Sequence, residues 1–329
     1  MLSEKILKNF GIQAVEMNKG VRSMEKKDIL NVDDLVVSFS MYKRGFKKEN
    51  LEVVHSLSLD IKEGEIVAVV GSSGSGKSIL AHAVMGLLPK NAYVGGKIRY
   101  RGEELNNENR KNLLGKKIVF IPQSIDYLDP VMKVGKQVVG VHSTKKRQEE
   151  MFQKYHLGKE VENMYPFQLS GGMARRVLVS SAVMESPDLI IADEPTPGLS
   201  LDMAMETMQN FREIADKGAG VLLITHDIDL AFHVADRIAV FYAGTIVEIA
   251  PTKDFMEGED ALRHPYSKAF LSALPQNEFK PIKGVQPYAG DLPTGCLFAK
   301  RCPNASKECY NDIPMRELRG GKVRCIHAT

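Results

Sequence analysis

Residues 71–78 combine three glycines, four serines and one lysine in an order that suits the binding of phosphate groups. In a turn of this composition, successive backbone N–H groups converge on phosphate oxygens at the start of a helix. Lys77 would neutralise the β and γ phosphates, and the Ser78 hydroxyl would ligate Mg²⁺. The pattern therefore predicts a phosphate loop for a nucleoside triphosphate. Its expected binding residues are Gly71, Ser72, Ser73, Gly74, Ser75, Gly76, Lys77 and Ser78.

Four more polar residues directly follow apolar runs and suit the hydrolysis of a bound triphosphate. Asp193 and Glu194 end the run at residues 189–192, where a Mg²⁺ ligand and a base that activates water are needed. Gln123 can bind Mg²⁺ or its water, and His226 can reach the γ-phosphate or the attacking water. The alternatives are a solvated acidic strand end, a loop cap and a structural histidine. The expected Mg²⁺ ligands are Ser78, Gln123 and Asp193.

A second glycine-rich helix start lies at residues 169–173, with the sequence Leu-Ser-Gly-Gly-Met. The N-terminus of a helix favours anions, so this segment is a second candidate phosphate-binding site. Two such sites are unexpected if one chain binds one nucleotide alone. The arrangement makes sense if Ser170, Gly171 and Gly172 bind the nucleotide held by a partner.

Four continuous apolar runs must position these side chains, at residues 65–70, 117–121, 189–192 and 221–225. Runs of this kind are typical of strands buried on both faces. Helical patterns separate them, which predicts βαβ units and a mainly parallel sheet. Because ligands bind beyond the carboxyl ends of such strands, the polar residues are expected to meet at one edge of the sheet.

Other segments predict the surroundings of this sheet. Residues 34–39 and 53–59 indicate an antiparallel hairpin before the first buried strand. The helix after the phosphate loop is expected to run from Lys77 to about Leu88, just before a proline. Residues 123–184 are polar and helical in pattern, and we interpret them as a helical subdomain inserted into the sheet domain.

The composition of the 329 residues predicts a folded protein with three parts: an N-terminal extension at 1–28, a main domain at 29–250 and a Cys-rich C-terminal extension at 251–329. The net charge of +3, with basic and acidic residues interleaved, gives no reason to expect nucleic acid as a partner. An apolar run of about eighteen residues and a secretory signal are both missing, so no membrane-spanning segment is expected.

Taken together and in this order, residues 71–78, 169–173, Gln123, Asp193-Glu194 and His226 resemble the nucleotide-binding domain of ABC ATPases over about residues 30–250. The resemblance implies an α/β fold with a RecA-like phosphate-loop NTPase core, an antiparallel β subdomain and an inserted helical subdomain. It also implies two such domains arranged head to tail, each ATP lying between one phosphate loop and the other Ser-Gly-Gly. Glu194 and His226 would be the catalytic residues.

Further stretches resemble the ATPases of oligopeptide, dipeptide and nickel importers; they are residues 165–168, 242–248, 264–267 and 295–303. This resemblance implies a transport-coupled ATPase on the cytoplasmic face of the membrane. Its partners would be a second, related ATPase subunit, two permeases and an extracytoplasmic substrate-binding protein. The choice between peptide and nickel stays open. The alternative is a soluble ABC ATPase that does not transport, but the fused domains or long coiled coil that would favour it are not present.

Two positions depart from the family pattern, and one feature is not determined. Ser200 replaces the usual aspartate after residues 195–199, and Ala174-Arg175 replaces the usual Arg-Gln after the signature. Both changes predict that the two composite nucleotide sites are not equivalent, which favours a heterodimer. The aromatic residue that stacks on adenine is Phe39, Tyr42 or Phe46.

All four cysteines lie within the last thirty-four residues, as Cys296, Cys302, Cys309 and Cys325. Disulfides are not expected in a cytoplasmic ATPase, and four thiolates suit either a tetrahedral zinc or a [4Fe–4S] cluster. The spacings match neither a zinc ribbon nor a ferredoxin run, so geometry leaves the metal open. The resemblance to the importer ATPases favours [4Fe–4S] over zinc, in a structural role.

Overall fold

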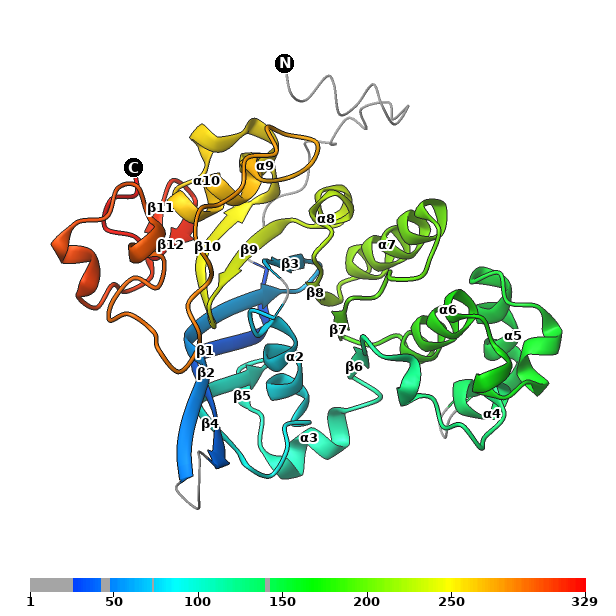
Figure 1. The fold of residues 1–329 in the computed structure, drawn as a ribbon. Helices are drawn as coiled ribbons and strands as arrows, with labels where there is room; N and C mark the ends of the chain where they lie inside the picture. The colour runs from blue at the N-terminus through cyan, green and yellow to red at the C-terminus, as the bar shows by residue number, and fades with distance from the viewer. Residues whose placement is uncertain (1–25, 43–47, 73, 140–142) are drawn as a thin grey trace.

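The computed structural model of the chain describes residues 26–42, 48–72, 74–139 and 143–329 (Figure 1). Most of the N-terminal extension predicted at 1–28, the candidate adenine-stacking residue Phe46 and the phosphate-loop residue Ser73 lie outside the described residues.

The central sheet has the strand order β11-β12-β10-β9-β3-β8-β7-β6 among the described residues. Strands β9, β3, β8, β7 and β6 are parallel neighbours, and every residue of β3, β7 and β8 is buried. The expected mainly parallel, doubly buried strands are therefore confirmed. The bounds are β3 (Ile66–Val70), β6 (Ile118–Ile121), β7 (Leu189–Asp193), β8 (Gly220–Ile224), β9 (Arg237–Tyr242), β10 (Thr245–Pro251), β11 (Arg316–Leu318) and β12 (Gly321–Val323).

A second, antiparallel sheet has the order β2-β1-β4-β5. Its strands are β1 (Asp28–Tyr42), β2 (Lys48–Lys62), β4 (Ala92–Tyr100) and β5 (Glu103–Glu104). The expected hairpin is confirmed by pairs such as Val37 with Val54. Buried side chains of this sheet, including Leu57, share one hydrophobic core with Val69 of the central sheet and Leu80 of the helix after the phosphate loop. The antiparallel sheet therefore supports the phosphate loop from one side.

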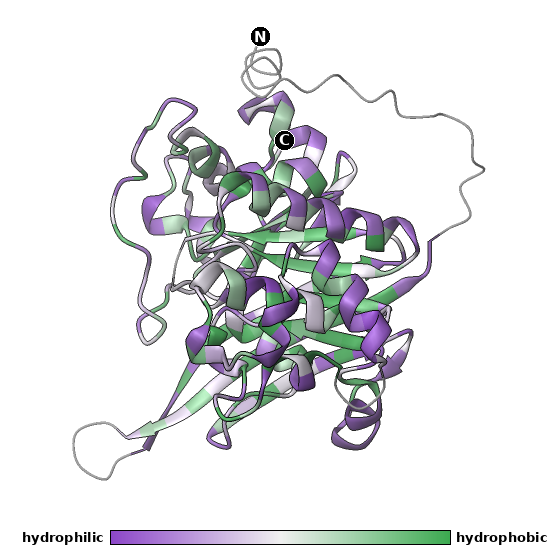
Figure 2. Ribbon diagram, turned by 90° about the vertical axis from the view of Figure 1, so that its right-hand side faces the viewer, coloured by the Kyte–Doolittle hydropathy of each residue, from purple (hydrophilic) through white to green (hydrophobic). Residues whose placement is uncertain are grey.

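Nine α-helices are described, with the bounds α2 (Lys77–Met85), α3 (Asn107–Leu113), α4 (Val134–Val139), α5 (Lys145–Lys154), α6 (Gly171–Ala182), α7 (Leu201–Asp216), α8 (Ile228–Val234), α9 (Thr252–Glu257) and α10 (Pro265–Ser272). Short 3₁₀ helices lie at Ile125–Tyr127, Lys159–Asn163, Pro166–Gln168, Glu259–Ala261, Ala299–Arg301 and Lys307–Tyr310. Figure 2 shows hydrophobic residues concentrated along the strands and hydrophilic residues on the outer faces of the helices. Helices α4, α5 and α6 form a separate group beyond β6, within the segment predicted to be a helical subdomain (Figure 1).

The helix that begins at Lys77 is shorter than expected. It ends at Met85 instead of Leu88, because Gly86 adopts the left-handed conformation with φ 69°. The N–H of Gly86 then bonds to the Ala83 carbonyl, and that of Leu87 to the His82 carbonyl. Glycine is the common residue for such a helix end, so the signal was Gly86 and not the later proline.

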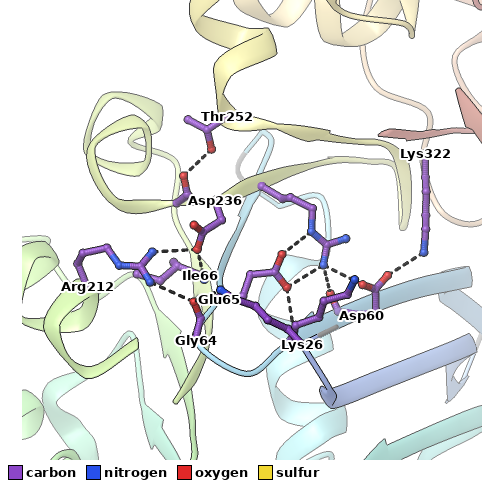
Figure 3. Close-up of polar contacts among 12 residues, drawn as sticks. Lys26, Asp60, Gly64, Glu65, Ile66, Arg212, Asp236, Thr252 and Lys322 are labelled. Carbon is purple, nitrogen blue, oxygen red and sulfur yellow. Dashed lines mark hydrogen bonds and ion pairs between the residues drawn. The ribbon is translucent and has the colours of Figure 1, made fainter. Parts of the chain in front are cut away.

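The C-terminal extension contributes two strands, β11 and β12, to the central sheet. β12 pairs with β10, with Val323 opposite Glu248. Figure 3 shows the polar contacts around Asp60, including those with Lys322. Lys322 Nζ lies 2.8 Å from Asp60 Oδ1, while Arg237 reaches Asp60 Oδ2 at 2.8 Å and Glu65 Oε1 at 2.7 Å. Burial alone would raise the pKa of Asp60, but the hydrogen bonds and charges of Lys322 and Arg237 outweigh it and lower that pKa. This carboxylate on β2 therefore links the antiparallel sheet to β9 and β12 of the central sheet.

Candidate active site

The phosphate loop lies between the end of β3 and the start of α2, as its sequence predicts. Gly71 has φ 156°, and a Cβ there would come within 2.3 Å of the Phe241 carbonyl oxygen on β9. Only glycine fits this close approach of two backbones. Lys77 Nζ donates hydrogen bonds to the carbonyl oxygens of Gly71 at 2.8 Å and Ser72 at 2.9 Å. The Lys77 side chain therefore folds back and bonds to the first two residues of the loop.

Lys77 and the two acids of β7 form one electrostatic group. The Lys77 residue is only 7% exposed, and burial lowers the pKa of its ammonium, while Glu194 and Asp193 oppose that shift. An ammonium needs nearby negative charge when it is taken out of water. In the structure that charge comes from the carboxylates of Asp193 and Glu194.

Asp193 fits the role of a Mg²⁺ ligand. It is 1% exposed at the end of β7, and burial raises the pKa of its carboxyl while a hydrogen bond with Ser78 lowers it. Two of the three predicted Mg²⁺ ligands are thus neighbours. Among the described residues, Asp193 Oδ1 is a buried acceptor with no hydrogen-bond donor. A buried oxygen without a partner is costly, and a hard cation such as Mg²⁺ would satisfy it.

Glu194 and His226 lie together at the same sheet edge. His226 Nδ1 lies 2.8 Å from Glu194 Oε2, and the Glu194 backbone N–H donates to the Ile224 carbonyl on β8. The side chain of Glu194 is 9% exposed, whereas that of His226 is 61% exposed. A largely buried carboxylate oriented by an accessible imidazole is suited to accept a proton from a water molecule.

Gln123 lies just after β6, and its backbone carbonyl accepts a hydrogen bond from Arg175 of α6 at 2.5 Å. Arg175 also donates to the Pro122 carbonyl at 2.6 Å and is 5% exposed. Burial lowers the pKa of Arg175, and the charges of Glu194 and Asp193 oppose that shift. The sequence alone shows Arg175 only as a departure from the family pattern. Its structural role is to hold the segment of Gln123 beside the two acids.

The Ser-Gly-Gly segment begins α6, where the Ser170 hydroxyl accepts a hydrogen bond from the Met173 N–H at 3.2 Å. Ser170 and Gly171 are exposed. Among the described residues, no hydrogen bond joins Ser170, Gly171 or Gly172 to residues 71–78. The expected role of this segment, at a nucleotide held by a partner, stays a prediction.

The candidates for adenine stacking differ in their surroundings. Phe39 is partly buried and packs against the core that includes β1 and β2. Tyr42 is 68% exposed, with Lys48 Nζ 5.5 Å from the centre of its ring. The choice between these residues and Phe46 also stays a prediction.

The four cysteines are free thiols, and Cys309 and Cys325 are buried. Burial raises the pKa of Cys296 to about 11, and the charges of Cys325, Cys302 and Cys309 add to that shift, which indicates that the four residues are neighbours. The Cys296 N–H also donates to the Cys309 carbonyl at 2.7 Å. However, in the part of the chain that the structure describes, no three His, Cys, Asp or Glu side chains form a ready-made metal site.

In the described ranges, none of the helices has the length and apolar character needed to cross a bilayer.

Comparison with known proteins adds two family matches. Residues 54–197 match the ABC transporter family, and residues 247–309 match the oligopeptide/dipeptide transporter C-terminal region. The dipeptide transport ATP-binding protein DppD of Escherichia coli (strain K12) is 35% identical over 91% of this chain and 96% of its own. DppD of Bacillus subtilis (strain 168) is 34% identical, and the oligopeptide transport ATP-binding protein OppD of E. coli (strain K12) is 33% identical. Each of these matches covers 90% of this chain and 92% of the relative.

Solved structures resemble the main domain. The dimeric structure of MJ0796, a bacterial ABC transporter cassette, has a TM-score of 0.60 and 26% identity, and the match covers 68% of this chain and 98% of that one. A dimeric post-hydrolysis state of the same cassette, bound to ADP and Pi, has a TM-score of 0.60 and 25% identity over the same shares.

Proposed function

Because this chain belongs to the ABC transporter ATP-binding proteins, in the group of the dipeptide and oligopeptide transporters, we propose that it powers the uptake of small peptides. It is an ATPase that couples the hydrolysis of ATP to transport. The observation that carries the peptide assignment is the C-terminal match at residues 247–309, which lies outside the ATP-binding cassette. Neither this match nor the relatives named above support the nickel alternative, and both argue against a soluble ATPase without a transport role.

The proposed roles of the residues follow from their positions. When bound, Mg²⁺ neutralises charge on the phosphate oxygens of ATP. Ser78 and Asp193 would hold this ion, with Gln123 nearby, and Lys77 would turn from its backbone carbonyls towards the phosphates. Glu194 would accept the proton of the attacking water, and His226 would keep the Glu194 carboxylate in position.

We also propose that the chain acts with a second, different ATPase subunit on the cytoplasmic face of the membrane. The exposed start of α6 supports this, because its N–H groups suit the phosphates of a partner's nucleotide. Ser200 and Ala174-Arg175 support unequal sites. The remaining partners would be two permeases and an extracytoplasmic substrate-binding protein.

Reconstitution of the complete transporter tests this function. The isolated chain is expected to hydrolyse ATP slowly, because Ser170, Gly171 and Gly172 act on a partner's nucleotide. Hydrolysis should rise when the second ATPase and the permeases are present in liposomes, and rise again with a dipeptide and its binding protein. A stable homodimer of this chain with full hydrolysis, independent of the other subunits, would contradict the heterodimer. Stimulation by Ni²⁺ and not by peptides would contradict the proposal that peptides are the transported substrate.

We propose further that Cys296, Cys302, Cys309 and Cys325 hold a metal centre, with [4Fe–4S] favoured over zinc. The support is that all four thiols of the chain are free and gather in one segment. Burial and the three neighbouring thiols raise the pKa of Cys296, and a bound cation would offset that shift because it favours the deprotonated thiols. Such a centre would cross-link a segment that has little regular secondary structure.

Purification without oxygen tests the metal centre. The protein is expected to be brown with broad visible absorption, and Cys302→Ser should remove the colour because one of four ligands is lost. Lys77→Ala, which leaves all four cysteines in place, should keep it. Colourless protein with one zinc per chain would overturn the cluster in favour of zinc. Protein with neither metal would leave the four thiols with a packing role only.

A further inference from the structure

The C-terminal segment contacts the phosphate loop directly. The Ser72 hydroxyl donates a hydrogen bond to Gln286 Oε1 at 2.9 Å, across 214 positions of sequence. In Figure 1 the chain after α10 runs past β10 towards β1 and β2 before it reaches the cysteines. A Cβ on Gly290 would lie 3.5 Å from Leu51 of β2, which places this loop against the antiparallel sheet as well. A long loop without regular structure in a folded domain usually has a function.

Arg301 fixes the part of this loop that carries Gln286. Its Nε donates to the Lys283 carbonyl at 2.8 Å, and its Nη2 to the Ile282 and Gly284 carbonyls at 3.2 and 3.1 Å. Nη1 donates to the Tyr242 hydroxyl at 3.1 Å. One guanidinium therefore binds three consecutive carbonyls, ending two residues before Gln286. Lysine has the charge but not the planar fork needed for this pattern.

A cluster of three aromatic side chains joins the C-terminal region to β9. The rings of Tyr242 and Tyr266 have centroids 4.4 Å apart, and Phe298 lies 5.5 Å from the first and 5.3 Å from the second. All three residues are at most 2% exposed. Burial raises the pKa of Tyr266 on α10, and the nearby Ser72 opposes that shift. The C-terminal region is thus packed around the first residues of the phosphate loop.

We propose that Gln286 is a positioning residue of the nucleotide site, held in place by Arg301. By accepting a hydrogen bond from the Ser72 hydroxyl, Gln286 keeps the phosphate loop in the conformation that receives ATP. A loop that is ordered before binding loses less conformational entropy when the nucleotide arrives, so affinity rises without a new contact to ATP. Gln286 lies outside the cassette match at residues 54–197 and inside the C-terminal match at residues 247–309. This inference rests on the proposed ATP site and extends it to the C-terminal region.

The first test compares nucleotide affinity in variants of the full chain, by titration with Mg²⁺-ATP in a calorimeter. Gln286→Ala is expected to weaken binding about fivefold, the usual effect of one hydrogen bond, with little change in kcat. Val285→Ala is the matched control, because Val285 is the preceding residue and is 87% exposed. Arg301→Lys should weaken binding as much as Gln286→Ala, and the double variant should be no weaker than either, since both act through one contact.

The second test uses trypsin, because Lys283 lies in the stretch that Arg301 holds. Binding linkage is reciprocal, so if the ordered loop favours ATP, then ATP must favour the ordered loop. Saturating Mg²⁺-ATP is expected to slow cleavage after Lys283 in the wild type and to have no such effect in Gln286→Ala. A loop with a merely structural role would be cut at the same rate with and without ATP.

Several results would overturn the inference. They are equal affinity in Gln286→Ala and Val285→Ala, tighter ATP binding in Gln286→Ala, additive losses in the double variant, and cleavage after Lys283 that ATP does not change. A wild-type chain that binds no ATP would instead contradict the nucleotide site itself. Thermal unfolding of each variant separates a loss of affinity from a loss of fold.

Discussion

Replacement of Lys77 by alanine is expected to abolish measurable ATP binding. Lys77 is 7% exposed, and its ammonium closes the phosphate loop through the carbonyls of Gly71 and Ser72. Without it, Asp193 and Glu194 lose the cation beside them, and the phosphates would meet two carboxylates with less opposing charge. The loss of two charge-assisted hydrogen bonds corresponds to about 3–4 kcal/mol, or roughly a hundredfold to a thousandfold in Kd.

Calorimetric titration with Mg²⁺-ATP checks this result. Lys90→Ala is a suitable control, since Lys90 is an exposed lysine that follows the same helix. The control should bind as the wild type does, and both variants should unfold at temperatures close to that of the wild type. Unchanged affinity and steady hydrolysis in Lys77→Ala would show that residues 71–78 are not the phosphate site.

Replacement of Glu194 by glutamine is expected to separate binding from hydrolysis. Glutamine has the size of glutamate and can still bond to His226, but its amide does not accept a proton from water at neutral pH. The Kd for ATP should therefore change by less than about twofold, while kcat falls on the order of a hundredfold to ten-thousandfold, the usual contribution of a general base. The two constants need to be measured separately in the complex with the second ATPase subunit.

The chain offers a matched pair for this experiment. His156 Nε2 lies 3.0 Å from Glu206 Oε1, a histidine and a glutamate in contact on the surface. Glu206→Gln makes the same chemical change at a residue outside the predicted nucleotide site and should leave kcat unchanged. If Glu194→Gln hydrolyses ATP at the wild-type rate, then the base is a different group and the Glu194–His226 contact has only a structural role.

The parts of the fold that local pattern determines were predictable. The apolar runs became β3, β7 and β8, because strands buried on both faces need apolar residues at every position. The polar residues that follow them met at one edge, because parallel strands bring their carboxyl ends together. The closeness of Asp193 to Ser78, and of Glu194 to His226, therefore follows from strand positions that the sequence predicts.

Contacts that depend on single polar side chains were not predictable. Gln286 and Arg301 lie in segments without apolar periodicity, so nothing local indicates that they reach Ser72 and Tyr242. Arg175 is similar, since its carbonyl partners are about fifty positions away in the chain. The pairing of β12 with β10 depends on two residue pairs only and has no signal at the level of strand pattern.

The pairing of β12 with β10 also determines when the molecule can finish folding. Synthesis proceeds from the N-terminus, so β10 emerges from the ribosome well before β12. In the folded protein, Glu248 of β10 pairs with Val323 of β12. Lys322 likewise reaches Asp60 across 262 positions. During that interval β10 is an edge strand with unpaired N–H and C=O groups, a surface that other chains can extend. A nascent ATPase would therefore be most exposed to misassembly late in translation, and a chaperone that covers this edge would act on a nearly full-length chain.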